Sequence, residues 1–419
     1  MSVFELFESE VRSYCRAFPA VFRRACGSFL FAEDGRRYID FMSGAGALNY
    51  GHNNPKLKRA LIDYLEDDGV AHSLDLATVA KQRFIERFVE TILRPRNLDY
   101  KLQFTGPTGA NGVEAALKLA RSVKQRRNIV AFSGAYHGLS SGALAVTANS
   151  HYRNEAWVNR TDVSFLPYDN FVEGVDSLPY IRKFIADPSS GVDKPAAVIL
   201  ETVQAEGGVN VASVEWLRSV ERLCRENDIL LIVDDIQVGN GRTGPYFSFE
   251  RAGIQPDIVV LSKSISGFGL PMTLVLLNRE LDQWKPGEHT GTFRGNNLAF
   301  VAAAEALDYW QTDALTQSVL HKGRLVQRRL REIAAANPDL NAQPRGLGLI
   351  QGLALQDPSK AAQIAEAAFH SGLIIERVGS QDNVLKILPP LTIEDTVLEE
   401  GLEILAQSCV TKKQTVTAG

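Results

Sequence analysis

Residues 229–244 read ILLIVDDIQVGNGRTG, a continuous apolar run that ends on two acids and passes into a glycine-rich loop. Apolar residues without alternation are typical of a strand that is buried on both faces, as in a parallel sheet covered by helices. Ligands bind at the carboxyl ends of such strands. Asp234 stands at that end, where a carboxylate needs either water or a positive partner. Taken alone, Asp234 fits a loop acid as well as a site residue.

Similar runs recur on both sides of this stretch, and helical periodicity separates several of them, as in residues 214–227. We therefore expect an α/β fold with a largely parallel sheet flanked by helices. Beyond residue 300, helical patterns at 299–310 and 320–335 precede strand-like pieces at 347–354 and 384–388, which indicates a second, smaller α+β region. The other apolar runs are 129–132 (IVAF), 196–200 (AAVIL), 258–261 (IVVL) and 274–277 (LVLL).

A further strand pattern near the start of the chain predicts a hairpin. Residues 28–41 read SFLFAEDGRRYIDF, with Glu33, Asp34 and Gly35 as the turn between two alternating arms. We assign this hairpin to the smaller region. The expected division is residues 1–55 as the first part of the small domain, 56–310 as the large domain and 311–419 as the second part of the small domain.

Composition narrows the class of protein. Of 419 residues, 45% are hydrophobic and 22% are charged, and 45 basic against 49 acidic residues leave a net charge of −4. This balance argues against disorder and against a nucleic-acid or polybasic membrane surface. The four cysteines show no C-x-x-C pair and no metal-ligand spacing, and no apolar stretch approaches the length of a membrane span. We expect a cytoplasmic protein that binds small molecules and copies of itself.

Lys263 is the second candidate for chemistry. It follows the apolar run 258–261 and lies within SKSISG, so small residues surround an amine at the end of another expected sheet strand. A surface lysine would also fit this position. Next to a carboxylate at a strand end, however, such a lysine can form a Schiff base with a carbonyl compound.

Two further segments could complete a site. Residues 105–112 (TGPTGANG) lead into a helical pattern at 113–124, and the free N–H groups of a helix N-terminus suit a phosphate. The segment matches neither the P-loop nor the dinucleotide-binding pattern. Tyr136 and His137 follow the run 129–132, where an aromatic ring could stack on a flat cofactor or simply pack in the core. Residues 138–142 spell G-x-S-x-G, but the expected strand ends too early for the nucleophile elbow of a hydrolase.

In their order along the chain these motifs resemble the class III aminotransferases, and the resemblance covers nearly the whole length. It implies fold type I, with a mostly parallel seven-stranded sheet flanked by helices plus a smaller α+β domain, and pyridoxal 5′-phosphate as the cofactor. The segments that carry it are 44–46 with 49–52, 108–119, 132–138, 201–208 (ETVQAEGG), 234–244, 262–263, 291–296 (GTFRGN) and 388–391 (LPPL).

Residue roles follow from the same resemblance. It implies that Lys263 anchors the cofactor and moves the proton, that Asp234 pairs with the pyridine nitrogen, and that Gln237 contacts the ring hydroxyl. Tyr136 would stack on the ring with His137 nearby, and the backbone N–H groups of Gly109 and Ala110 would hold the phosphate. Thr292 would reach the phosphate of a neighbouring subunit, which implies a homodimer with shared active sites.

The substrates implied are an amino donor and a 2-oxo acid. Four segments of the sequence are similar to the family members that transfer an amino group between L-2,4-diaminobutyrate and 2-oxoglutarate. The segments are 104–121, 234–244, 261–272 and 285–297. This reaction gives or uses L-aspartate 4-semialdehyde and L-glutamate, and it belongs to ectoine- or siderophore-type pathways. The alternatives are another ω-aminotransferase, acting on ornithine, acetylornithine, 4-aminobutyrate or a secondary-metabolite amine, and a mutase, racemase or non-catalytic subunit of the same fold.

The cation that binds the substrate carboxylate is less clear in the sequence. Many relatives carry an arginine where this chain has Lys386, and lysine lacks the planar fork of a guanidinium. Arg294 stands where glycine is common, so both residues are candidates, and we favour Lys386 because it occupies the matching position. Glu206 matches a glutamate that can neutralise this cation while the diamino substrate is bound.

Overall fold

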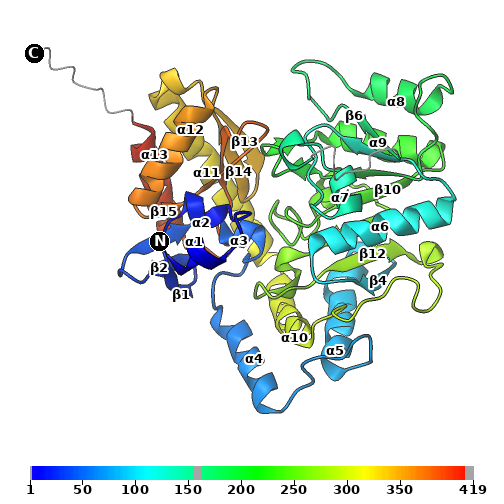
Figure 1. Ribbon diagram of the computed structural model, residues 1–419, viewed down its shortest axis with the longest axis horizontal. Coiled ribbons are helices and arrows are strands. Elements are labelled where there is room, and N and C mark those ends of the chain that lie inside the picture. Colours follow the sequence, from blue (N-terminus) through cyan, green and yellow to red (C-terminus); the bar gives the residue numbers. More distant parts are fainter. Residues whose placement is uncertain (1, 154–161, 411–419) are drawn as a thin grey trace, which may run out of the picture.

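The computed structural model describes residues 2–153 and 162–410, and it places them in two adjoining lobes (Figure 1). The helices and strands between residues 100 and 281 form one lobe. Residues 2–50 lie beside residues 311–410 in the other lobe. No helix in the described part of the chain is long and apolar enough to cross a membrane.

A seven-stranded sheet forms the centre of the first lobe, as expected for the α/β fold. Its order is β4-β12-β11-β10-β7-β5-β6, and all neighbours are parallel except β12, which runs antiparallel to both β4 and β11. The strands are β4 (Tyr100–Phe104), β5 (Ile129–Phe132), β6 (Val163–Leu166), β7 (Ala197–Leu200), β10 (Leu230–Asp234), β11 (Ile258–Leu261) and β12 (Leu274–Asn278). The mostly parallel seven-stranded sheet is therefore confirmed.

The continuous apolar runs reflect burial on both faces of this sheet. Alternate residues of β10, such as Ile232 and Val233, belong to two different core clusters, one on each face. Helix α6 (Gly109–Lys124) contributes Val113, Leu117 and other residues to one cluster, and helix α9 (Val214–Glu226) contributes residues such as Trp216 to the other. Because both faces are covered, the inner strands are apolar up to their ends, whereas the edge strands β4 and β6 contain polar residues such as Lys101 and Ser164.

Helix α6 begins at Gly109, four residues before the helical pattern that starts at Val113. Thr108 caps the helix, since its hydroxyl oxygen accepts the N–H of Asn111 while the Asn111 side chain reaches back to the Thr108 N–H. This reciprocal cap satisfies backbone N–H groups at the start of the helix. Because it is made by polar side chains, the apolar pattern does not show where the helix begins. The small residues Gly109 and Ala110 are therefore the first turn of the helix rather than a loop before it.

The second lobe contains two four-stranded sheets, and the predicted hairpin is present in one of them. Strands β2 (Phe29–Ala32) and β3 (Arg37–Asp40) pair around residues 33–36, and they join β1 (Phe22–Cys26) and the distant β15 (Leu373–Ile374). The expected piece at 347–354 is itself a hairpin. The second sheet has the order β13-β14-β17-β16, with β13 (Gln343–Leu347), β14 (Ile350–Ala354), β16 (Glu376–Val378) and β17 (Val384–Ile387).

Helices pack around these sheets and connect the lobes. Helices α4 (Pro55–Glu66), α5 (Val79–Phe88) and α10 (Asn297–Ala306) lie together at the lower end in Figure 1. Helices α11 (Ala314–Ala336), α12 (Pro358–His370) and α13 (Asp395–Cys409) cover the second lobe. One apolar core includes Ile39 and Leu398 of the second lobe as well as Val233 of the first, so the two lobes share buried surface.

Candidate active site

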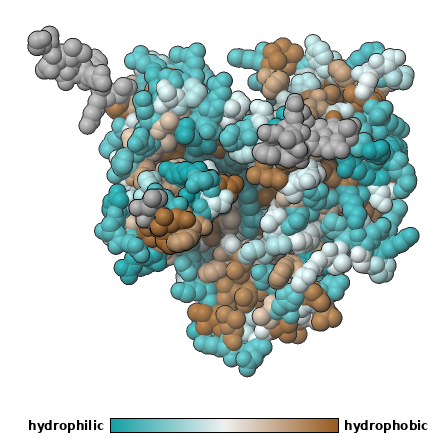
Figure 2. All heavy atoms as spheres, in the orientation of Figure 1, coloured by the Kyte–Doolittle hydropathy of each residue, from teal (hydrophilic) through white to brown (hydrophobic). Residues whose placement is uncertain are grey.

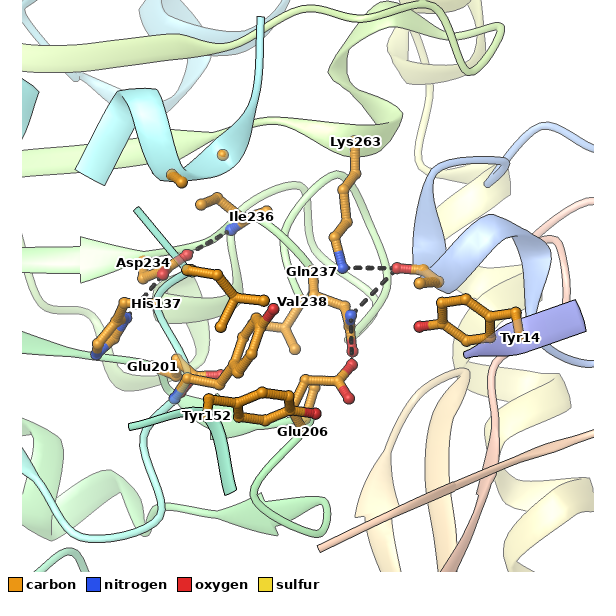
Figure 3. A pocket seen from close by; sticks show the side chains of 17 residues that line it. Tyr14, His137, Tyr152, Glu201, Glu206, Asp234, Ile236, Gln237, Val238 and Lys263 are labelled. Atoms are coloured by element: carbon orange, nitrogen blue, oxygen red, sulfur yellow. Dashed lines mark hydrogen bonds and ion pairs between the residues drawn. The ribbon is translucent and has the colours of Figure 1, made fainter. Parts of the chain in front are cut away.

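A cavity of about 410 Å³ opens where the strands β7, β10 and β11 end. Its lining brings together most of the residues that the sequence singled out. Figure 3 shows side chains from the first lobe on one side of the cavity and Tyr14, from the second lobe, on the other. The lining residues from these motifs are Gly109, Ala110, Tyr136, His137, Glu206, Asp234, Gln237 and Lys263.

Lys263 enters the cavity from the end of β11. It opens a short 3₁₀ turn (Lys263–Ser266), and its amine donates a hydrogen bond of 2.8 Å to the carbonyl oxygen of Ala45. Burial lowers the pKa of the Lys263 amine below its usual value, although the negative charge of Glu206 opposes this shift. A lowered pKa favours the neutral amine, which is the form that acts as a nucleophile or a base.

Asp234 is the last residue of β10 and is almost fully buried. One carboxylate oxygen lies 2.8 Å from Nδ1 of His137, and the other accepts the N–H of Ile236 at 3.1 Å. His137 has a completely buried side chain, so its ring fixes the orientation of the carboxylate. The pair presents an oriented acid to the cavity from the sheet edge.

The positive end of a helix also lines the cavity. Gly109 and Ala110 open α6, where backbone N–H groups have no partner within the helix. A Cβ on Gly109 would lie 2.9 Å from Ile236 Cδ1, so glycine lets the helix approach the loop after β10 closely. The arrangement suits a phosphate group.

Two aromatic rings line the wall next to this end. Tyr136 and Tyr152 make an edge contact with ring centroids 5.4 Å apart. Burial raises the pKa of Tyr136 to about 12, with a smaller contribution from the charge of Glu206. Tyr136 therefore keeps its phenol proton at physiological pH and presents a neutral ring to the cavity.

Lys386 lies behind the cavity wall, in strand β17, and is fully buried. Its amine lies 2.6 Å from one oxygen of Glu206 and 2.6 Å from one oxygen of Glu376, and it donates to the side-chain oxygen of Gln237 at 3.0 Å. Glu206 is the member of this cluster that lines the cavity. Burial raises the pKa of Glu206, but the charges of Lys386 and Lys263 outweigh it and hold that pKa at about 2.

Thr292 and Arg294 do not line the cavity of their own chain. Both lie in the segment 288–296, where Thr292 is exposed and its carbonyl oxygen contacts the ring of His72 at 3.0 Å. Arg294 donates to the carbonyl oxygen of His289 at 3.4 Å. Of the two candidate cations, only Lys386 is thus in contact with a residue of the cavity.

The hydrolase pattern at 138–142 has no elbow geometry. Strand β5 ends at Phe132, and Ser140 precedes the short helix α7 (Ser141–Ala145) after an intervening loop. The Ser140 hydroxyl donates to Glu114 at 2.7 Å, and Glu114 also accepts the N–H groups of Gly142 and Ala143. Glu114 thus caps the N-terminus of α7, and the Ser140 hydroxyl is engaged in a structural hydrogen bond to it.

Four carboxylate or phenol groups of the site were not found from the sequence, namely Glu201, Glu376, Tyr14 and Tyr152. Glu201 follows the buried strand β7 just as Asp234 follows β10, so the argument from strand ends could have identified it. Burial and the charge of Asp234 raise the pKa of Glu201. Glu376 faces Lys386 across the β16–β17 pair, and Tyr14 enters the cavity from α2 (Tyr14–Ala17); neither lies in a recognisable motif.

Comparison with known proteins places this geometry in a family. Residues 12–409 match the family described as Aminotransferase class-III. The chain belongs to the class III aminotransferases. It is 58% identical over 409 residues to the diaminobutyrate–2-oxoglutarate transaminase of Wolinella succinogenes, covering 97% of this chain and 96% of the relative, and 57% identical to the enzyme of that name from Bordetella parapertussis, covering 97% and 94%.

Solved structures of aminotransferases share the fold. The ornithine aminotransferase of Toxoplasma gondii superposes with a TM-score of 0.86 over 97% of this chain and 93% of that chain, at 24% sequence identity. An aminotransferase of Bacillus anthracis gives the same TM-score at 23% identity, covering 97% and 96%. The fold type I architecture expected from the motifs is thereby confirmed.

Proposed function

We propose that this class III aminotransferase transfers an amino group between L-2,4-diaminobutyrate and 2-oxoglutarate, giving or using L-aspartate 4-semialdehyde and L-glutamate. The observation that carries the proposal is the meeting of the Lys263 amine, the Asp234 carboxylate and the N-terminus of α6 in one cavity. The names of relatives at 57–58% identity over nearly the whole chain supply the substrate pair.

The cavity fits pyridoxal 5′-phosphate, the cofactor of class III aminotransferases. Lys263 offers the amine that would hold its carbonyl carbon, the N–H groups of Gly109 and Ala110 would hold its phosphate, and Asp234 would pair with its ring nitrogen. Gln237 would contact the ring hydroxyl and Tyr136 would cover one ring face. When bound, the cofactor supplies an electron sink for the carbon from which the amino group leaves.

Lys263 is the group that would move the proton during transfer. Its amine is buried, and burial lowers its pKa, which favours the neutral form that would accept the proton from the substrate carbon. Asp234, which His137 and the N–H of Ile236 hold in place, would be engaged with the ring nitrogen instead. Lys263 would thus be the base that moves the proton, and Asp234 would be a carboxylate held in a fixed position.

Substrate carboxylates would be recognised at the side of the cavity where Glu206, Lys386 and Tyr14 meet. Glu206 covers Lys386 at 2.6 Å and would have to move aside before a carboxylate of glutamate or 2-oxoglutarate could contact that amine. The pKa of the Tyr14 phenol is raised by burial and then by the charges of Glu376 and Glu206. It therefore remains a hydrogen-bond donor toward either substrate.

The enzyme would act as a homodimer with shared sites. Large apolar side chains are exposed on α1 (Val3–Phe7) and on the segment that follows α4, and Phe293 is exposed beside Thr292. Figure 2 shows such brown surface over α1 and at the lower end of the molecule. A second copy that covers these residues would bring Thr292 to the phosphate end of its partner's cavity. The exposed apolar residues are Val3, Phe4, Leu6, Phe7, Leu65, Val70, Leu74, Leu76, Val79 and Phe293.

We also propose a cytoplasmic location and the two-domain division at residues 55 and 310. All four cysteines are free thiols and two of them are exposed, which fits a reducing compartment. The pairing of β3 with β15 supports the assignment of the first residues to the same domain as the last hundred.

The test supplies a panel of amino donors with 2-oxoglutarate as the acceptor and measures the rate at which glutamate forms. Diaminobutyrate should give the highest kcat/KM, and a preference for ornithine, acetylornithine or 4-aminobutyrate would change the substrate but keep the reaction. Absence of glutamate formation with every donor would favour a mutase, racemase or non-catalytic role. Lys263→Ala should abolish turnover, since acid–base catalysis alone contributes about 10²–10⁴-fold; near-normal turnover would remove Lys263 from this role.

A further inference from the structure

The segment Ser43–Gly46 next to the cavity has an unusual backbone. Four consecutive residues have positive φ values, which are 50° at Ser43, 59° at Gly44, 54° at Ala45 and 86° at Gly46. Left-handed backbone costs residues with a Cβ about 1–2 kcal/mol each, and single left-handed residues are the rule. Such strain persists only where the surrounding structure holds it, and it concentrates at functional sites.

On one side the turn is held by Asp40, the last residue of β3. The Asp40 carboxylate is 1% exposed, and one of its oxygens accepts the N–H groups of Met42 and Ser43, both at 2.8 Å. The other oxygen lies 2.7 Å from Nε2 of His52. Every acceptor position of this buried acid is thus directed at the turn or at the histidine that orients it.

On the other side the turn is tied to the residue after Lys263. The Ser264 hydroxyl donates to the carbonyl oxygen of Gly46 at 2.7 Å and accepts the N–H of Asn49 at 3.1 Å. Lys263 itself has a φ of 53°, so both partners of the Lys263–Ala45 contact lie on left-handed backbone. The hydrogen bond from Lys263 to Ala45 therefore joins two segments of strained backbone at the cavity.

The product of this arrangement is one carbonyl oxygen aimed into the cavity. The carbonyl oxygen of Ala45 accepts a hydrogen bond from the Lys263 amine at 2.8 Å and another from the side-chain amide of Gln237 at 3.1 Å. A carbonyl oxygen carries no charge, so it accepts a hydrogen bond from the neutral amine as well as from the ammonium, although the bond from the ammonium is stronger. A carboxylate at this place would instead hold Lys263 in its charged form.

We propose that the left-handed turn Ser43–Gly46, held by Asp40, is a docking acceptor that positions the Lys263 amine whenever this lysine is not bound to the cofactor. Asp40 is then a positioning residue that acts through the Ala45 carbonyl. The inference rests on the proposed role of Lys263. The charged groups that also act on the amine are Glu206, Lys386, Glu376 and Asp234, and the carboxylates among them are already engaged by Lys386 or His137.

The test uses the cofactor-free protein and the chemical reactivity of Lys263. Trace acetylation between pH 6 and 11, quantified by mass spectrometry of the peptide that contains Lys263, reports the pKa and accessibility of this amine. Asp40→Ala should release the turn, so the ammonium loses an acceptor, and the Lys263 pKa should fall by about one unit, equivalent to about tenfold in the neutral fraction. Hydrogen exchange at Met42 and Ser43 should accelerate in the same variant.

A second variant covers the case in which Asp40→Ala fails to fold. Gly44→Ala adds one methyl group to a left-handed residue, and its Cβ would meet only ordinary contacts with Leu48 and Ala47. It should shift the Lys263 pKa in the same direction. The matched control is Gly253→Ala, the same change at a φ of 65° on an exposed residue ahead of the opposite end of β11, which should leave the Lys263 profile unchanged.

The outcomes separate this inference from the proposed function. A Lys263 profile that is unchanged in Asp40→Ala and Gly44→Ala, while the Met42 and Ser43 amides exchange faster, would overturn the docking role and leave the aminotransferase proposal intact. Full turnover by Lys263→Ala would instead overturn the role of the lysine on which the inference rests. A lowered Lys263 pKa in both turn variants, with the Gly253→Ala profile normal, supports the proposal.

Discussion

At the scale of single residues, Asp234 is the sharpest test of the cofactor site. Asp234→Asn keeps an oxygen that can accept the N–H of Ile236, but it turns an NH2 group toward His137 and removes the negative charge that would face the ring nitrogen. We expect kcat for the half-reaction with glutamate to fall by about 10–150-fold, the equivalent of about 1.5–3 kcal/mol for a hydrogen bond to a charged group. Stopped-flow absorbance of the cofactor measures this rate.

The fold should survive the Asp234→Asn change, because the amide is isosteric and the N–H of Ile236 can still be accepted. Equal melting temperatures of the variant and the parent protein are the control. A half-reaction rate like that of the parent would show that Asp234 does not pair with the ring nitrogen.

A test of whether Lys386 binds 2-oxoglutarate needs a variant that keeps the net charge of its cluster unchanged. Lys386→Met alone would leave two buried carboxylates without a counter-ion, which is strongly destabilising. The double variant Lys386→Met with Glu376→Gln removes one charge of each sign. We expect it to raise the KM for 2-oxoglutarate by about tenfold or more, or about 1.4 kcal/mol, as steady-state kinetics would show.

Arg294→Gly is the comparison for that experiment. Arg294 does not line the cavity of its own chain and bonds the carbonyl of His289, so this change should affect the KM less. The opposite ranking of the two variants would assign carboxylate recognition to Arg294, contributed by a partner subunit.

What the sequence could reveal of the site follows from where each residue stands. Asp234 and Lys263 end buried strands, and the edge of a parallel sheet brings such residues together whatever the details of packing. Glu376 is different, because it becomes part of the site only through the antiparallel pairing that sets it opposite Lys386. Tyr14 reaches the cavity from a four-residue helix without a motif, so only the tertiary structure identifies it.

At the scale of elements, helix α6 is the part whose position the phosphate depends on. It packs closely on the sheet at Gly112, where an added Cβ would lie 2.6 Å from Thr273 Cγ2 and 2.7 Å from Val260 Cγ1. Gly112→Ala should therefore push the N-terminus of α6 away from the sheet. We expect a loss of about 1–3 kcal/mol in stability from overpacking and a weaker Kd for pyridoxal 5′-phosphate, measured by denaturation and by cofactor titration.

Ser122→Ala on the exposed side of the same helix is the matched control. It also introduces alanine, which has the higher helix propensity, and it should leave both stability and cofactor affinity at or slightly above those of the parent protein. If Gly112→Ala behaved like this control, the close approach of α6 to the sheet would not determine cofactor binding.

Elements differ in how well the sequence predicts them. The five strands β5, β7, β10, β11 and β12 of the central sheet were located within one residue because strands covered on both faces are apolar nearly throughout. The edge strands β4 and β6 were not predicted, since they are less buried and contain polar residues such as Lys101 and Ser164. The start of α6 was missed because its first turn consists of small residues held by a side-chain cap, which leaves no apolar signal. The left-handed turn Ser43–Gly46 was also beyond prediction, since two of its four residues are not glycine and only the surrounding contacts hold them.

At the scale of the whole molecule, the exposed apolar residues and the outlying position of Thr292 have one common explanation. Phe7 and Phe293 are more than half exposed, at 84% and 67%, and exposed apolar surface can mark an interaction site. A dimer in which Thr292 serves the partner's cavity would bury this surface and complete each site. The arrangement predicts a specific pattern of complementation between defective chains.

That pattern appears when chains carrying Lys263→Ala are mixed with chains carrying Thr292→Glu, whose acid would repel the phosphate in the partner's cavity. In a mixed dimer, one cavity has an intact Lys263 and receives an intact Thr292 from its partner, whereas the other cavity has both defects. Random pairing of equal amounts should regenerate about a quarter of the parent activity, because about half of the dimers are mixed and each has one working site.

Mixing Lys263→Ala with Asp234→Asn is the control, since both defects then stay in the cavity of their own chain and nothing should be regained. Mixed dimers that form, as native mass spectrometry can show, yet remain inactive would mean that Thr292 serves no partner, and a fully active monomer in sedimentation would contradict the shared site altogether.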